Sequence, residues 1–202
     1  MEESSHKHLR NLSSKAKALY SLYPFESWHH RTKVELSSAR LANHQVVVSC
    51  SGGADSIFSL LLIHHYLNGS QHCIHVNHGV RGKNSDKDAS FVKEFCDKIN
   101  CESSILSLQA PDDSNEGFLR DKRMQIIGLE LERMGAKYLV QGHQKDDIAE
   151  SFLWRLSRGA SPSGLCSPKP AQKHGDTIFL RPFLTASRAE IRNCLKELAI
   201  PW

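Results

Sequence analysis

The segment VVVSCSGGADSIFSLLLIHHYL, residues 46–67, joins a short apolar run to a longer one through a glycine-rich turn. The first run is short and β-branched, as in strands that are buried on both faces of a parallel sheet. The second run has the length and apolar character of a packed helix. The segment therefore predicts a strand, a tight turn and a helix.

The rest of the chain continues this alternation of strands and helices. Four further runs predict strands, at His72–Asn77, Ser104–Leu108, Tyr138–Gln141 and Thr177–Arg181. Helices are predicted at about Ser85–Asn100, in the segment that ends at Gly135, and at about Asp146–Leu156 and Ser187–Leu198. Such alternation through right-handed crossovers predicts an α/β fold, a doubly wound parallel sheet with helices on both faces.

Residues 1–44 differ from the rest of the chain. They are polar and rich in Ser, His, Lys and Arg, with a short apolar patch at Leu19–Phe25 that Pro24 interrupts. This composition predicts a partly helical extension that is poorly ordered or loosely packed. The 202 residues suffice for one sizeable α/β core, which we place at residues 45–202.

The overall composition indicates the cellular compartment of the protein but does not identify its partner. A formal charge of +4 permits a nucleic-acid partner without demanding one. The six cysteines include no C-x-x-C pair, which predicts reduced thiols rather than a disulfide framework or a zinc site. No stretch approaches the roughly 18 apolar residues of a membrane span. We therefore expect a cytoplasmic protein with no membrane partner.

The glycine-rich turn carries the strongest chemical signal. A phosphate needs backbone N–H groups that approach it closely, and two glycines before a helix N-terminus supply them. This interpretation predicts a nucleotide phosphate site formed by Ser51, Gly52, Gly53, Ala54, Asp55 and Ser56. The alternative is a turn that uses glycine only for tight packing. Walker and Rossmann spacings are absent.

Several segments resemble known families. The turn SGGADS resembles the PP-loop of the N-type ATP pyrophosphatases, adenine nucleotide alpha hydrolase-like enzymes that split ATP between its α- and β-phosphates. Four later segments are similar, in the same order, to those of the tRNA(Ile)-lysidine synthetases: HVNHGVR (75–81), NEGFLRDKR (115–123), GHQKDDIAE (142–150) and RPFL (181–184) with Arg188. The resemblance covers about residues 45–202.

The resemblance implies a set of site residues. The implied catalytic residues are Asp55, Arg120, Arg123, His143, Asp147 and Glu150, with His78 as a further ATP ligand and Asp55 and Asp147 as ligands of Mg²⁺. Structural alternatives remain for several of them. His143 could cap a helix, and the acids at the start of that helix could stabilise its dipole. The two arginines could lie on a solvated face. Because Asp147 and Glu150 are three residues apart, we expect them to share a helix face.

The resemblance also implies a reaction. ATP adenylates the wobble cytidine of tRNA(Ile) with a CAU anticodon, and free L-lysine is then ligated to C2 with release of AMP. Alternatives are a tRNA thiolase, a synthetase that acts on a small acid, and a nucleotide-binding protein without turnover. Met124 departs from the family's usual tyrosine, and the sequence stops at Trp202, where the family continues. We therefore expect a domain truncated at its C-terminal end that binds tRNA weakly.

Overall fold

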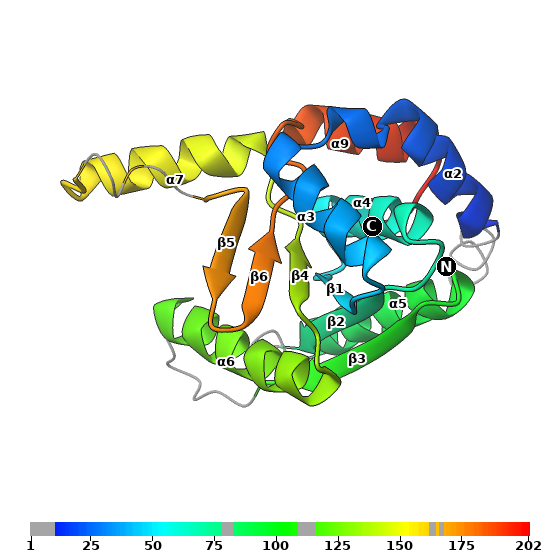
Figure 1. The fold of residues 1–202 in the computed structure, drawn as a ribbon, viewed down its shortest axis with the longest axis horizontal. Helices are drawn as coiled ribbons and strands as arrows, with labels where there is room; N and C mark the ends of the chain where they lie inside the picture. The colour runs from blue at the N-terminus through cyan, green and yellow to red at the C-terminus, as the bar shows by residue number, and fades with distance from the viewer. Residues whose placement is uncertain (1–10, 78–82, 109–115, 162–164, 166–167) are drawn as a thin grey trace.

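A computed structural model describes residues 11–77, 83–108, 116–161, 165 and 168–202 (Figure 1). A six-stranded sheet with the order β3-β2-β1-β4-β6-β5 forms its centre. The strands are β1 (Val46–Ser49), β2 (His72–Asn77), β3 (Glu102–Ser107), β4 (Tyr138–Gln141), β5 (Ala171–His174) and β6 (Thr177–Leu180). The helices of the domain are α4 (Ala54–Tyr66), α5 (Lys83–Lys98), α6 (Glu116–Met134), α7 (Lys145–Ser157) and α9 (Arg188–Glu197). The predicted fold class is confirmed.

The central strands β1, β2 and β4 are buried on both faces, as their apolar runs predict. Val46 and Val48 pack in one core with α4, α5 and α9, whereas Val47 packs on the opposite face against Ile127 and Leu131 of α6. β1 pairs in parallel with both β2 and β4. The carboxyl ends of these three strands therefore meet at one edge, where ligands bind in open α/β sheets.

One strand was not predicted. β5 pairs antiparallel with β6 and forms the sheet's edge through a turn at Gly175, whose φ is +59°. Its sequence, AQKH, lacks the β-branched and aromatic residues that favour strands. Pairing with β6 rather than local propensity forms this strand, so the sheet is mostly rather than wholly parallel.

The helices before β1 belong to the main core. They are α2 (Leu12–Leu22) and α3 (His30–Leu41), joined through the 3₁₀ helix η1 (Phe25–Ser27). Leu12, Leu19 and Leu36 are at most 1% exposed and lie in the same cluster as the α4 side chains. The expectation of loose packing is therefore wrong for these helices. The apolar residues of these helices are spaced so that they form one buried face. The many polar residues around them made this pattern difficult to recognise in the sequence.

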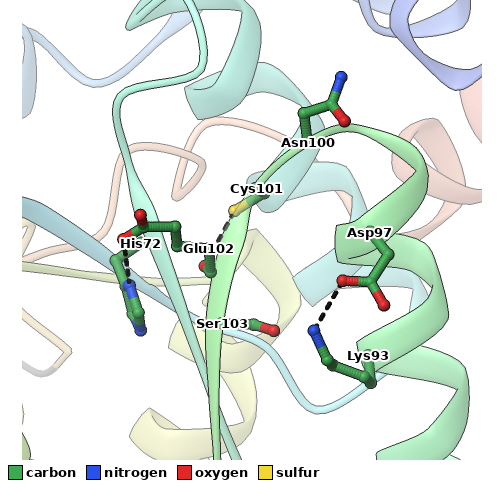
Figure 2. A pocket seen from close by; sticks show the side chains of 7 residues that line it. All are labelled: His72, Lys93, Asp97, Asn100, Cys101, Glu102 and Ser103. Atoms are coloured by element: carbon green, nitrogen blue, oxygen red, sulfur yellow. Dashed lines mark hydrogen bonds and ion pairs between the residues drawn. The ribbon is translucent and has the colours of Figure 1, made fainter.

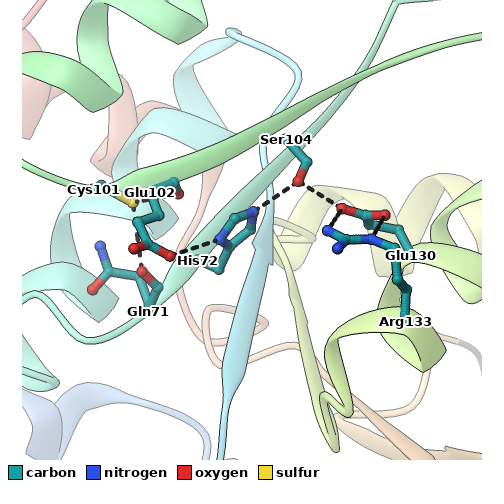
Figure 3. Close-up of polar contacts among 7 residues, drawn as sticks. All are labelled: Gln71, His72, Cys101, Glu102, Ser104, Glu130 and Arg133. Atoms are coloured by element: carbon teal, nitrogen blue, oxygen red, sulfur yellow. Dashed lines mark hydrogen bonds and ion pairs between the residues drawn. The ribbon is translucent and has the colours of Figure 1, made fainter.

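A polar chain joins α6 to the sheet (Figure 3). The Ser104 hydroxyl donates to Glu130 Oε1 at 2.7 Å and lies 2.9 Å from His72 Nε2. Arg133 donates to both oxygens of Glu130, at 2.7 and 2.8 Å. These contacts with Arg133 and Ser104 lower the pKa of Glu130 to about 2. They fix the position of the helix that carries Arg120 and Arg123.

Five of the six cysteines lie among the described residues. Cys50, Cys73, Cys96 and Cys101 are buried free thiols, and Cys194 is a half-buried one. Cys166 lies outside the described residues. Within the described ranges, no helix combines the length and apolar character needed to cross a membrane.

We expect Leu19→Ala to lower the free energy of unfolding by about 2–5 kcal/mol, because the substitution leaves a cavity in the core. Leu22, on the same helix, is 43% exposed and provides the matched control. We expect Leu22→Ala to cost less than about 1 kcal/mol. Urea denaturation of both variants measures the difference. Equally small losses would show that α2 is not part of the core.

Candidate nucleotide-binding and catalytic site

The turn between β1 and α4 is shaped by Gly52 and Ser56. The φ of Gly52 is +91°, and a Cβ there would meet Val92 Cγ2 at 3.3 Å, so glycine is required. The Ser56 Oγ accepts from the N–H groups of Ser51 and Gly52, each at 3.1 Å, and donates to the carbonyl of Gly53 at 2.8 Å. In this arrangement the Ser56 hydroxyl shapes the turn.

The first turn of α4 is open at its N-terminus. Gly53 precedes the helix in an extended conformation, and no side chain caps the helix there. The N–H groups of Ala54 and Asp55 begin the helix and have no intrahelical acceptor. A Cβ on Gly53 would meet only Ser51 Oγ, at 3.6 Å. Free amides, a helix dipole and open space together suit a phosphate group.

Gly142 brings the end of β4 against α4. A Cβ there would lie 2.8 Å from the Asp55 carbonyl oxygen and 3.0 Å from Ser59 Oγ, closer than side chains tolerate. Only glycine permits this approach, which places the segment leading into α7 beside the first turn of α4. The sequence motif contained Gly142, but no role was predicted for it. A glycine directly after a predicted strand was the available signal.

The carboxyl group of Asp55 lies where the charge of Asp147 acts on it. Asp55 Oδ1 is buried without a hydrogen-bond partner. Burial is the main cause that raises the pKa of Asp55, and the charge of Asp147 is the next. Burial also raises the pKa of Asp147. Burial makes the charged form of each carboxylate less stable, and a cation bound between the two would offset that effect.

This pair fits a magnesium ion. Among the described residues no group of three or more His, Cys, Asp or Glu side chains could hold a metal ion by itself. Mg²⁺ needs no such group, because it is commonly held by one or two carboxylates together with substrate phosphates and water. Asp55, with its unpartnered oxygen, and Asp147 are consistent with that donor set.

α7 begins with a capping box. Gln144 is the N-cap and accepts from the N–H of Asp146 at 2.6 Å, while Asp147 Oδ2 accepts from the N–H of Gln144 at 2.8 Å. The alternative of a helix cap at His143 is therefore wrong, since Gln144 has that place. Asp147 Oδ2 therefore takes part in capping the helix, and Asp147 Oδ1 remains available for other contacts.

Arg188 joins the acids of α7 to α9. Its Nη2 donates to Glu150 Oε1 at 2.7 Å and lies 3.9 Å from Asp147 Oδ1, while its backbone N–H donates to Asp146 Oδ2 at 2.8 Å. Asp147 and Glu150 thus share a face, as their spacing predicts. A cationic group already lies between them in this structure, which shows that the pair can hold one.

A second group of side chains lies at the ends of β4 and β6. Arg181 Nε donates to His143 Nδ1 at 3.2 Å, which places the ring proton of neutral His143 on Nε2. Burial, followed by the charges of Arg181 and Arg120, lowers the pKa of His143 to about 4. His143 is therefore neutral at pH 7, and Arg120 lies near enough to act on it.

The structure gives less information on two of the predicted site residues. Arg123 lies on α6 with Arg120 and is exposed, in contact with other groups of the protein. His78 lies outside the described residues. The catalytic and ATP-binding roles of all the predicted residues remain predictions.

A surface pocket lies at the opposite, amino-terminal end of the parallel strands, where β2 and β3 begin (Figure 2). Its lining consists of His72, Lys93, Asp97, Asn100, Cys101, Glu102 and Ser103. Lys93 Nζ pairs with Asp97 Oδ1 at 2.6 Å. Because the glycine-rich turn follows the carboxyl end of β1, this pocket is separate from the candidate site.

Comparisons with known proteins assign the family. The PP-loop domain family matches residues 27–202, a match that begins before the predicted boundary at residue 45. The tRNA(Ile)-lysidine synthase of Bacillus licheniformis is 32% identical over 165 residues, covering 78% of this chain and 35% of that protein. That of Wolbachia pipientis is 33% identical over 174 residues, covering 83% and 40%. The chain thus spans between about a third and a half of the length of such relatives.

Solved structures share the fold. The U34-tRNA thiolase NcsA from Methanococcus maripaludis superposes with a TM-score of 0.64 and 22% identity, covering 78% of this chain and 57% of that one. The NH3-dependent NAD synthetase from Campylobacter jejuni superposes with a TM-score of 0.56 and 13% identity, covering 93% and 73%. These likenesses support the architecture alone.

We expect Gly53→Val and Asp55→Ala each to abolish measurable ATP binding without unfolding the protein. The valine would occupy the open space above the turn, and the alanine removes a carboxylate of the site. Gly128→Val is the control, because a Cβ at Gly128 meets nothing within 4 Å. Calorimetric titration with ATP measures the affinities. Wild-type affinity in both site variants would contradict the phosphate-binding role of the turn.

Proposed function

Because the chain belongs to the family of PP-loop domains, which bind ATP, we propose that it activates a tRNA base by adenylation for ligation to lysine. The observation that carries this proposal is the convergence of the glycine-rich turn, the α7 carboxylates and the His143–Arg181 pair at one sheet edge. The matched relatives named tRNA(Ile)-lysidine synthase support the choice of reaction.

The turn and its neighbouring carboxylates bind ATP in this proposal. Ser51, Gly52 and Gly53 line the phosphates, and the free amides at the start of α4 donate to them. Asp55 and Asp147 would hold Mg²⁺, which would offset negative charge on the phosphates. His78 remains a predicted further ATP ligand.

The first step is adenylation of the wobble cytidine of tRNA(Ile) with a CAU anticodon. O2 of the cytosine ring attacks the α-phosphate, and pyrophosphate leaves. Arg120 and Arg123 offset the negative charge that develops in the transfer. His143 is neutral at pH 7, so its Nε2 can donate a hydrogen bond without adding a further positive charge.

The second step joins lysine to the activated base. The ε-amine of free L-lysine attacks C2, and AMP leaves. The amine must first lose a proton, which needs a nearby acceptor. Asp147 and Glu150 are suited to orient the ammonium group, because they already share the guanidinium of Arg188.

The two steps give separate expectations. Pyrophosphate release from ATP should require unmodified tRNA(Ile), and AMP release should require lysine in addition. Both products can be followed with ATP labelled in the α- or γ-phosphate. Glu150→Gln should slow lysine-dependent AMP release more than pyrophosphate release, because Glu150 is proposed to act in the second step alone.

The controls separate the alternatives. Glu132→Gln, a substitution of an exposed acid on α6, should leave both steps unchanged. Pyrophosphate release that proceeds equally well without any tRNA would favour a synthetase that acts on a small acid. Turnover that needs a sulfur donor rather than lysine would favour a thiolase.

A further inference from the structure

Arg181 is buried without a carboxylate partner among the described residues. It is 8% exposed, and its Nη1 donates to the Lys169 carbonyl at 2.7 Å while Nε donates to His143. Among the described residues, no ion pair joins a carboxylate to Arg181 or to Arg120. A buried charge of this kind is costly unless an opposite charge compensates it.

The surroundings of Arg181 increase that cost. Burial, followed by the charge of Arg120, lowers the pKa of Arg181 to about 10. The neighbouring His143 is uncharged at pH 7 and accepts a hydrogen bond from Arg181 rather than supplying negative charge. The charge of Arg120 therefore acts on Arg181, and an anion bound between the two guanidinium groups would be attracted by both.

The position of this cluster separates it from the glycine-rich turn. His143 follows β4 and Arg181 follows β6, and β4 lies between β1 and β6 in the sheet. Neighbouring strands are about 4.8 Å apart, so the end of β6 is about 10 Å from the end of β1. A phosphate bound by the turn would leave Arg181 uncompensated.

We propose that Arg181 and Arg120, with the Nε2–H of His143, form a second anion site that takes a phosphate group. Guanidinium groups are suited to phosphate because they donate two parallel hydrogen bonds to it. The phosphate can come from the nucleotide or from a nucleic-acid backbone. The claim that the site binds phosphate is independent of the reaction, whereas the nucleic-acid source rests on the proposed function.

Titration with inorganic phosphate tests the site. The Gly53→Val background blocks the glycine-rich turn, so the remaining affinity reports the second site. Arg181→Met and Arg120→Gln should each weaken phosphate binding about tenfold, the usual effect of losing a charge-assisted hydrogen bond. Lys122→Gln, on the same helix as Arg120 and in contact only with Gln125 among the hydrogen bonds of the described residues, should have no effect. Equal affinity in all four proteins would overturn the proposal.

Thermal stability gives an independent readout. Removing an uncompensated buried charge should not lower the melting temperature of Arg181→Met without phosphate, and phosphate should raise that temperature less than in the parent. A parent protein that phosphate does not stabilise would contradict the site. Arg120 is exposed, so Arg120→Gln tests the same claim if Arg181→Met does not fold.

Binding measurements on the protein with an intact glycine-rich turn identify the source of the phosphate. If Arg181→Met weakens ATP binding alone, the site takes a phosphate of the nucleotide. If it weakens binding of an anticodon stem-loop RNA alone, the site takes a backbone phosphate. Unchanged affinity for both would overturn the proposal. Phosphate binding that persists while tRNA-dependent pyrophosphate release is absent would contradict the proposed function and leave this site standing.

Discussion

The close approach of Gly142 to the first turn of α4 is the constraint on which the candidate site depends. The parallel pairing of β1 with β4 sets the two strand ends side by side, and the missing side chain of Gly142 lets them meet. That contact brings Asp55 near Asp147, so that each carboxylate lies on a different helix yet acts at one place. Without it the turn would be a phosphate site with no facing acids.

The carboxyl edge of the sheet divides into two regions of opposite charge. Next to β1, the acids Asp55, Asp147 and Glu150 gather around Arg188 and suit a metal ion and an amine. Next to β6, Arg181 and Arg120 suit an anion. A substrate that is itself a polyanion and reacts with an amine matches both regions.

Strong local patterns were predictable from the sequence, and features formed by tertiary contact were not. The strands at His72–Asn77 and Tyr138–Gln141 match the prediction at both ends, since buried apolar runs leave few alternatives. β5 depends on its partner strand, and Leu19 is buried only because a facing helix covers it. The resemblance likewise made His143 a candidate, but it could not show that Gln144 caps α7 or that Arg181 is buried.

Our proposal is that α4 and α7 form a single site for ATP with its metal ion. Its most direct test is the affinity of Asp147→Asn for ATP with and without Mg²⁺, since asparagine keeps an oxygen for the capping contact with Gln144. We predict that Mg²⁺ strengthens ATP binding to the wild type and has little effect on the variant, while affinity without Mg²⁺ is unchanged. An equal gain from Mg²⁺ in both proteins would contradict a shared site.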